Sequence, residues 1–190
     1  MGTVALGPLG ARLLSSFVSE LAPRRIDTAS PVSLLDAPEN ADAIALHDYW
    51  QSKRGERPMP DRRDIVPSEL VRMLPSVAII EVIDGGRDFR FRLFGSELAT
   101  WMGCDRTGQR FSEMQPAPNV DLTPEQVQKR WVDVASGALA AARPIFPKAP
   151  VLTSGAVLTM HAVIMPLTAG GSEIEQLFGG AFVTSTPDGN

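Results

Sequence analysis

The sequence is short of the residues that build disulfides and metal centres. Its 190 residues contain a single cysteine, Cys104, and two histidines, His47 and His161. One cysteine excludes an internal disulfide and a multi-cysteine metal site, so the chain tolerates a reducing compartment and we expect a cytoplasmic location. A metal site built on the doublet of His47 and Asp48 would need several further ligands, and only one other histidine is present. We expect no metal.

The chain also lacks an excess of positive charge and a long apolar run. Eighteen basic residues against 22 acidic ones give a formal net charge of -4, which provides no field to hold a nucleic acid or an anionic membrane. The apolar stretch at residues 1–23 has no basic leader, and Pro8 and Arg12 interrupt it well before the roughly 20 residues that a membrane span needs. We expect no nucleic-acid partner, no signal peptide and no membrane span.

Recognisable catalytic motifs are missing as well. The chain has no Gly-x-Ser-x-Gly elbow, no phosphate loop, no dinucleotide glycine pattern and no serine–histidine pairing that the sequence supports. The acids Glu81 and Asp84 lie near a predicted hairpin, where exposed carboxylates are common. The sequence predicts no catalytic residue, and we expect a protein that is not an enzyme.

The composition favours one folded domain with tails. A hydrophobic content of 44% in 190 residues suffices for one well-cored domain. We expect this domain at residues 36–186, after an extension and linker at 1–35 that is partly disordered or an amphipathic helix, and before a tail at 187–190. Apolar residues recur at helical spacing in the extension, so it could form an interface with a partner or a second copy. The candidate interface residues are Leu13, Leu14, Phe17, Val18 and Leu21.

Local signals predict the elements of the first half. Pro38 and Glu39 suit the first turn of a helix that ends near Gly55, with Ile44, His47 and Trp50 on its packing face. Pro67 can begin a second short helix that stops before Pro75. Two strands at 77–83 and 88–94 are joined by a tight turn at 84–86. Strict alternation places Phe89, Phe91 and Leu93 on one face of the second strand.

The second half predicts short helices at 95–115, one longer helix and three strands. Thr123, Pro124 and Gln126 form a capping box at the start of the long helix, which should end near Arg143. Its expected buried stripe consists of Val127, Trp131, Val134 and Ala138. The last strands lie within 144–152, 155–167 and 173–185, and Pro147 and Pro150 move the first of them toward a sheet edge.

This order of elements, an antiparallel sheet with segregated helices, is that of a PAS domain. The segments "YWQSKRGERPMPDRRDIVPSELVRMLP" and "FRFRLFGSELATW" resemble a small, mainly alphaproteobacterial PAS family with a YW…RG…P-R-D-I-P lead-in and an FRYRLVGT-like strand. The resemblance covers residues 46–184 and implies an α+β fold. It further implies a five-stranded antiparallel sheet with helices on one side, and a lead-in anchored to the sheet by Arg62, Asp64, Ile65 and Pro67.

The resemblance implies a non-catalytic sensory or regulatory module that acts by small-molecule binding, by protein–protein interaction, or by both. The fold places a pocket between the inner sheet face and the helices, and ordinary core packing is the alternative role of each pocket candidate. These candidates are Phe91, Leu93, Trp101, Met114, Trp131, His161 and Met165. We expect a small molecule or a signalling protein as partner, and a homodimer.

Two other functions stay open. One is a small NTF2-like enzyme that uses His161 and an acid in an apolar pocket, and the other is a purely structural adaptor. A filled core would favour the interaction module, whereas a buried histidine beside a carboxylate in an open cavity would favour the enzyme.

Cofactors of this fold are disfavoured. Flavin photoreceptors place a cysteine directly before an Arg-Phe pair, but here Gln109 precedes Arg110 and Phe111, and Cys104 lies five positions earlier. His161 falls in a predicted strand, whereas haem-binding members place their ligand on the long helix. We expect neither flavin nor haem.

Overall fold

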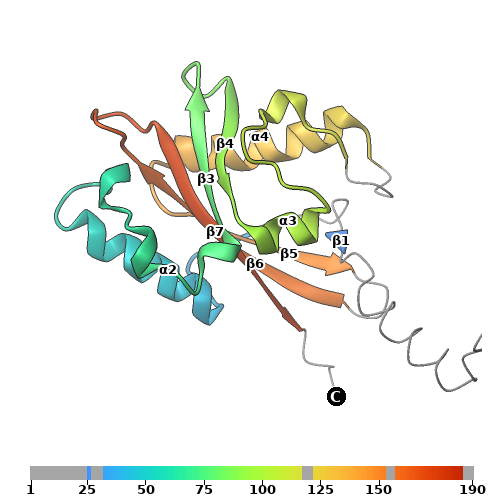
Figure 1. Ribbon diagram of the computed structural model, residues 1–190, viewed down its shortest axis with the longest axis horizontal. Helices are drawn as coiled ribbons and strands as arrows, with labels where there is room; N and C mark the ends of the chain where they lie inside the picture. The colour runs from blue at the N-terminus through green and yellow to red at the C-terminus, as the bar shows by residue number, and fades with distance from the viewer. Residues whose placement is uncertain (1–24, 27–31, 117–121, 153–156, 186–190) are drawn as a thin grey trace, which may run out of the picture.

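The computed structural model describes residues 25–26, 32–116, 122–152 and 157–185. Its centre is one antiparallel sheet in the order β1-β5-β6-β7-β3-β4, with β2 also paired to β5 (Figure 1). The strands are β1 Arg25–Ile26, β2 Ser33–Leu35, β3 Val77–Ile83, β4 Asp88–Phe94, β5 Phe146–Leu152, β6 Val157–Leu167 and β7 Gln176–Ser185. The helices are α2 Ala41–Arg54, α3 Ser96–Met102 and α4 Pro124–Ala141, with 3-10 turns at Arg62–Asp64, Pro67–Glu69, Leu74–Ser76 and Phe111–Glu113.

The expected α+β architecture is confirmed, and all five predicted strands form as β3 to β7. The short strands β1 and β2 were not predicted, and both pair with β5. β5 would otherwise be an edge strand, as Pro147 and Pro150 indicate. The sheet therefore begins upstream of residue 36, inside the segment that the sequence assigned to the linker.

Helix α2 is fixed by a cap and by one buried hydrogen bond. The Asn40 side chain accepts from the backbone N–H groups of Asp42 at 2.9 Å and Ala43 at 3.0 Å, so the helix begins three residues after Pro38 rather than at it. The Trp50 indole donates to the Pro166 carbonyl of β6 at 3.0 Å. The helix buries Ala43, Leu46 and Trp50, whereas the predicted stripe residue Ile44 is 39% exposed.

Helix α4 follows its capping signal. Thr123 and Gln126 form the expected box, and the helix ends at Ala141. Its buried residues are Val127, Ala135 and Ala138. Val134, expected in the stripe, is only half-buried, because the next residue, Ala135, is the one that is buried at this turn of the helix.

The β3–β4 hairpin turns as predicted, but β4 does not alternate throughout. Asp84, Gly85 and Gly86 all take positive φ angles of 50°, 68° and 90°. The register then shifts between Ile79 and Ile80, which pair with Leu93 and Phe91 respectively. The extra residue on β4 makes a β-bulge that turns Leu93 to the face opposite Phe91.

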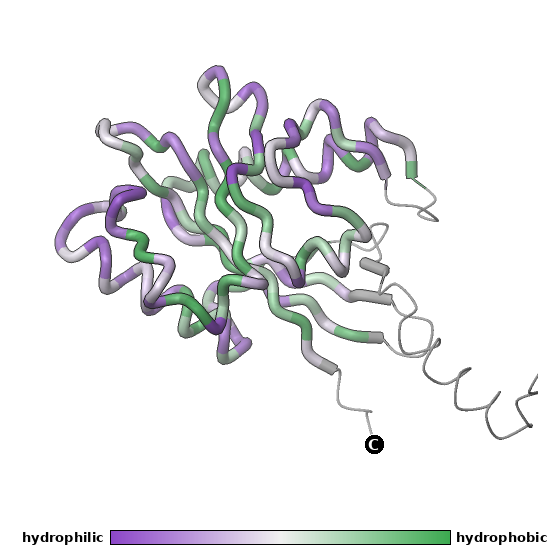
Figure 2. The backbone as a smooth tube through the Cα atoms, in the orientation of Figure 1, coloured by the Kyte–Doolittle hydropathy of each residue, from purple (hydrophilic) through white to green (hydrophobic). Residues whose placement is uncertain are grey.

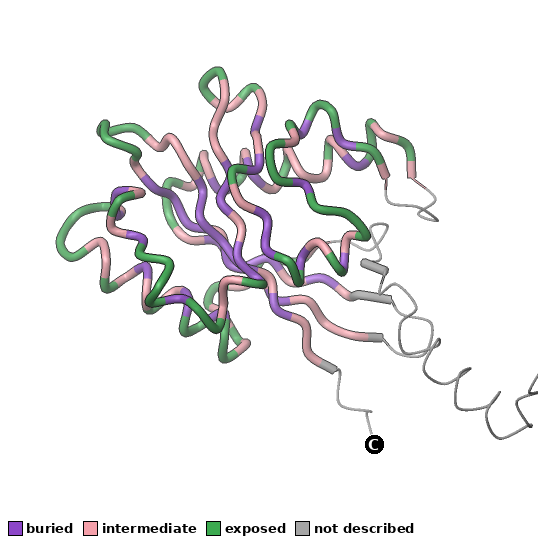
Figure 3. Tube along the Cα trace, in the orientation of Figure 1, coloured by how far each residue is buried: buried purple, intermediate pink, exposed green. Residues whose placement is uncertain are grey.

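Both faces of the sheet are covered. On the face that we call the α2 face, α2 and the lead-in pack against Val77, Val163, Met165 and Phe178. On the face that we call the α4 face, α3, α4 and the turn at Phe111–Glu113 pack against β4 and the neighbouring strands. The sequence placed the helices on one side, and α2 is the element that lies on the other (Figure 1). Hydrophobic and buried residues accordingly run along the central strands (Figures 2 and 3).

The lead-in is held to the β6–β7 turn through Asp61. Its carboxylate accepts from the backbone and the guanidinium of Arg63, both at 2.9 Å, from the Thr168 hydroxyl at 3.2 Å and from the Gly170 N–H at 2.8 Å. Hydrogen bonds from the Arg63 side chain hold the pKa of Asp61 well below its usual range. Asp64 closes the turn by accepting from the Asp61 N–H at 2.8 Å.

The other lead-in residues act in the same architectural way. Ile65 is 4% exposed and belongs to the core under α2. Pro67 opens a 3-10 turn rather than the single short helix that we predicted up to Pro75. The Arg62 guanidinium donates to the Ile65 carbonyl at 3.3 Å.

Candidate functional site

An aromatic cluster occupies the space between the α4 face of the sheet and the helices, where the sequence predicts a pocket. The ring of Phe91 lies 4.8 Å from Phe94, 4.9 Å from Phe111 and 5.4 Å from Trp131, measured between ring centroids. Phe91, Phe111 and Met114 are 0% exposed. Separations of this size are contact packing of aromatic rings, so side chains of the protein fill this space.

Four of the seven predicted pocket residues meet in this cluster. Phe91 comes from β4, Trp101 from α3 and Trp131 from α4, and Met114 follows the turn at Phe111–Glu113. Trp101 is 6% exposed, and Trp131 is half-buried. These four residues share one space between the sheet and the helices, and packed side chains occupy it.

The other three, Leu93, His161 and Met165, lie on the α2 face, so the expectation that all seven line one space is wrong for them. Leu93 is turned away by the bulge in β4. Met165 is paired with Phe178 and belongs to the core under α2. His161 lies four residues before Met165 on β6, so strand alternation places both side chains on the same face.

His161 is a nearly buried histidine whose cross-strand neighbour is a lysine. It is 9% exposed, and its Nδ1 has no hydrogen-bond partner among the residues that the structure describes. Its cross-strand neighbour is Lys148, whose Nζ lies 2.7 Å from the Glu39 carboxylate. Burial lowers the pKa of His161, and the positive charge of Lys148 lowers it further. A lowered pKa favours the neutral form of His161, and the carboxylate of Glu39 pairs with Lys148 at 2.7 Å.

One buried cation was not foreseen. Arg106 is 2% exposed and donates to the Gln109 side chain at 2.8 Å and to the Gln115 carbonyl at 3.0 Å. Among the described residues no carboxylate lies within 4.0 Å of it. Arginine is usually exposed, so the sequence carries no signal of this burial. Through these two hydrogen bonds Arg106 connects distant parts of the loop between α3 and α4.

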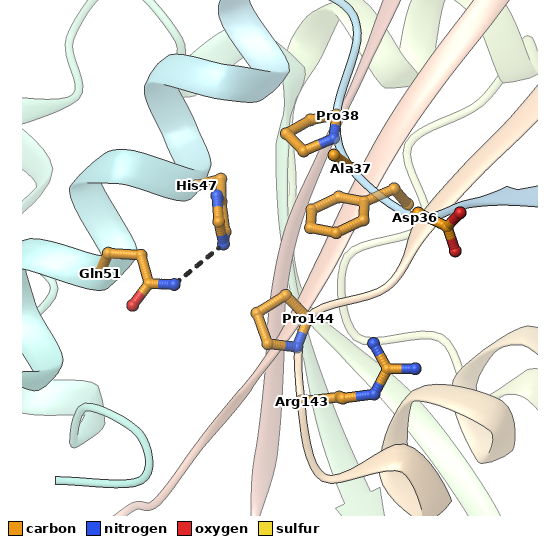
Figure 4. A pocket seen from close by; sticks show the side chains of 8 residues that line it. Asp36, Ala37, Pro38, His47, Gln51, Arg143 and Pro144 are labelled. Atoms are coloured by element: carbon orange, nitrogen blue, oxygen red, sulfur yellow. Dashed lines mark hydrogen bonds between the residues drawn. The ribbon is translucent and has the colours of Figure 1, made fainter.

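An open depression of about 200 Å³ lies at the edge of the α2 face. It is lined by the 36–38 segment, by His47 and Gln51 of α2, by residues 143–144 after α4, and by Phe146. His47 meets Phe146 edge-on at 5.2 Å and 88°. In Figure 4 His47 and Gln51 lie across the space from Pro38 and Pro144, and the charged ends of Asp36 and Arg143 lie on the side remote from His47. The sequence marked His47 as a packing residue and gave no signal that residues near 36 and 143 would join it.

The His47 ring is held by its neighbour along the helix. The Gln51 amide nitrogen lies 3.2 Å from His47 Nε2 (Figure 4), and the Gln51 amide oxygen accepts from Arg54 at 2.6 Å. Burial lowers the pKa of His47, and the nearby charge of Asp48 opposes the shift. With Nε2 as the acceptor, the neutral ring carries its proton on Nδ1.

Two sequence expectations concern features outside the core. Cys104 is an exposed free thiol. The candidate interface residues Leu13, Leu14, Phe17, Val18 and Leu21 lie outside the described residues. Within the described ranges no cluster of three metal-binding side chains occurs, and no helix there is long and apolar enough to cross a bilayer.

Comparison with known proteins decides the family. The model of the PAS domain family matches residues 39–181, which is most of the chain and contains β3 to β7 up to the middle of the last strand. The chain belongs to the PAS domain family. This PAS domain is similar to the PAS domain of BvgS from Bordetella pertussis, with 16% sequence identity over 60% of this chain and 83% of that chain, and a TM-score of 0.36. Comparison with curated proteins gives no match. Membership of the family supports a sensory or regulatory module in general.

Proposed function

We propose that this PAS domain is a regulatory module that acts through contact with another polypeptide, either a signalling protein or a second copy of the chain. The observation that supports this proposal is the aromatic cluster on the α4 face. Three of its members, Phe91, Phe111 and Met114, are 0% exposed. An interior that is filled in this way leaves the surface of the domain as the place where a signal is received and passed on.

The energetic argument rests on what an interior ligand would displace. Removing a buried phenylalanine from its packing costs about 3–5 kcal/mol, while micromolar affinity amounts to about 8 kcal/mol. A ligand that pushed Phe91 or Trp131 aside would lose a large part of its binding free energy to that displacement. A surface partner has no such cost.

We propose that the protein is not an enzyme and carries neither flavin nor haem. The NTF2-like alternative requires His161 beside a free carboxylate, whereas its neighbour is Lys148, and Glu39 is bound to that lysine at 2.7 Å. Cys104 is exposed, and His161 lies on the opposite face from the cluster. An exposed free thiol is compatible with the reducing cytoplasm that we propose as its location.

The test of the filled interior is indole, which matches the side chain of Trp131. In the Trp131→Ala variant indole should cause a saturable shift of the Met114 methyl resonance, since apolar cavities bind apolar ligands of matching shape. In the wild-type protein the same resonance should stay unchanged over the same concentrations. Met165, on the α2 face, is the internal control in both spectra.

A saturable shift of Met114 in the wild-type protein would contradict the proposal, whatever the variant does. That result would mean that the cluster opens for a small ligand, and it would restore the interior pocket as the site of function.

A further inference from the structure

Both histidines of the chain lie between α2 and the sheet, and the sequence contains no others. His47 comes from α2, and its ring meets Phe146 of β5 edge-on at 5.2 Å. His161 comes from β6 and is 9% exposed on the α2 face. Its cross-strand neighbour Lys148 pairs at 2.7 Å with Glu39, which directly precedes the cap residue of α2. One helix–sheet interface therefore contains every imidazole of the protein.

The surroundings of His161 favour the neutral ring. Among the residues that the structure describes, its Nδ1 has no hydrogen-bond partner, and no carboxylate oxygen lies within 4.0 Å of its ring nitrogens. The residues paired with it across the sheet are Lys148 on β5 and Phe182 on β7. Burial and the positive charge of Lys148 lower the pKa of His161, against an opposing effect of Glu39. A proton added to His161 places a second cation next to Lys148.

A hydrogen bond along α2 favours the neutral form of His47 as well. The Gln51 amide nitrogen lies 3.2 Å from His47 Nε2, and the Gln51 amide oxygen accepts from Arg54 at 2.6 Å. A proton on Nε2 would place two donors against each other, and turning the amide over would break the hydrogen bond with Arg54. The neighbouring rings of Trp50 and Phe146 offer no acceptor atom in its place.

The charged groups near His47 do not reverse this preference. Asp48, the next residue of α2, is exposed and raises the pKa of His47, but burial has the larger effect and lowers it. The charged ends of Asp36 and Arg143 lie on the side of the depression remote from His47 (Figure 4). Within the described ranges no carboxylate oxygen lies within 4.0 Å of the His47 ring nitrogens. Both histidines are therefore neutral near pH 7 while α2 is docked on the sheet.

We propose that protonation of His47 and His161 weakens the docking of α2 on the sheet, so that acid acts on this domain through that helix. A histidine whose pKa is lower in the docked state than in the released state contributes to docking above its released-state pKa of about 6.5. That contribution is lost as the pH falls below this value toward the docked-state pKa. The inference goes beyond the proposed function, because it assigns an input to the domain and does not depend on which polypeptide the domain contacts.

The experiment is hydrogen exchange of the full chain between about pH 7.5 and 5.5, followed by NMR. The amides of Leu46 and Trp50 report on α2, and the amide of Ala138 reports on α4. After correction for the intrinsic exchange chemistry, each histidine should raise the opening constant of α2 by up to about tenfold per pH unit, and the pair by up to about a hundredfold. The α2 amides should open more often than Ala138 at every pH, because release of α2 precedes unfolding of the domain.

Two variants separate the contributions of the histidines. His47→Gln and His161→Gln each remove one proton from the process, so each should lower the dependence to about tenfold per pH unit, and the double variant should show none. Arg92→Gln, which changes an exposed charge on β4, should keep the wild-type dependence. Should a glutamine variant fail to fold, the ring C–H resonances of the wild-type protein decide, because the pKa of both histidines should lie below about 6.5.

The proposal is overturned if the opening of α2 does not change with pH, if one single variant abolishes the whole dependence, or if the double variant retains it. Equal opening constants for α2 and α4 would overturn it too, because they would mean that the domain unfolds as a whole. In the resonance titration, a pKa at or above about 6.5 for either histidine is the contradicting result. The proposed function fails on a different result, the entry of indole into the wild-type interior.

Discussion

Replacing Phe91 by alanine removes the centre of the aromatic cluster. The side chain is 0% exposed and contacts the rings of Phe94, Phe111 and Trp131 at 4.8, 4.9 and 5.4 Å. A fully buried Phe→Ala change costs about 3–5 kcal/mol through lost transfer energy and the cavity left behind. Because three aromatic contacts are lost together, we expect a value in the upper half of that range.

The assay is urea unfolding followed by tryptophan fluorescence. With a urea m value of about 2 kcal/mol per molar, a loss of about 4 kcal/mol lowers the midpoint by roughly 2 M. For a domain of this size the same loss lowers the melting temperature by roughly 8–16 °C. The matched control is Arg92→Ala, which lies next to Phe91 on the same strand but is exposed. It should change stability by less than about 0.5 kcal/mol.

The refuting result is a loss below about 1 kcal/mol for Phe91→Ala, which is too small for a core phenylalanine. Equal losses in both variants would also refute the reasoning, since they would show that the face assignment along β4 is wrong.

Three further predictions test other parts of the structure. Asp61→Asn should destabilise the protein most at neutral pH. Because the folded pKa of Asp61 is lowered, its contribution to the free energy of unfolding is present above the unfolded pKa of about 3.9 and is lost as pH falls through the folded value. The difference in urea-unfolding free energy between variant and wild type should therefore narrow in acid, and a constant difference would contradict the role of the carboxylate charge. Gly137→Ala in α4, where an added Cβ meets open space, should stabilise the protein by up to about 1 kcal/mol, whereas Gly179→Ala, whose Cβ would lie 2.5 Å from the Val163 carbonyl oxygen, should destabilise it by about 1–3 kcal/mol; the same sign for both in thermal melts would contradict the backbone geometry. A chain that starts at Val32 keeps β2 and should still melt cooperatively, and light scattering should show a lower oligomeric mass than for the full chain. An unchanged mass would show that the N-terminal extension is not the interface.

Local signals in the sequence predicted those elements that depend on neighbouring residues. The capping box at Thr123 and the run of positive φ angles at 84–86 are properties of a few consecutive residues, and both form as expected. The five main strands follow from their β-branched and aromatic content. The resemblance to a PAS family added that these five strands form one antiparallel sheet, which the structure confirms.

The differences arise where distant segments meet. The bulge opposite Ile79 and Ile80 adds a residue to β4 without any glycine to mark it, so strict alternation misplaced Leu93. β1 and β2 have two and three residues and form only because β5 offers an edge. The α2 face could not be assigned from helical periodicity, because a periodic pattern shows which side of a helix is apolar and not which face of a sheet it covers.

The candidate sites show the same division. Phe91, Trp101, Met114 and Trp131 were chosen as large residues near the inner face, and the structure brings these four into one cluster. The depression depends on segments near residues 36, 47 and 143, which are brought together only by the packing of α2 and by the end of α4. No local pattern joins them. The same holds for the burial of Arg106 in its loop.

Native mass spectrometry of the protein, isolated from its host without denaturation, tests the proposed function most directly. The account predicts that the chain is found in a complex with another polypeptide, which is either a second copy or a different protein. It also predicts that the mass of the chain corresponds to its amino-acid sequence, without a small molecule retained in its interior. A monomer that carries one tightly held small molecule, released only on unfolding, would contradict it.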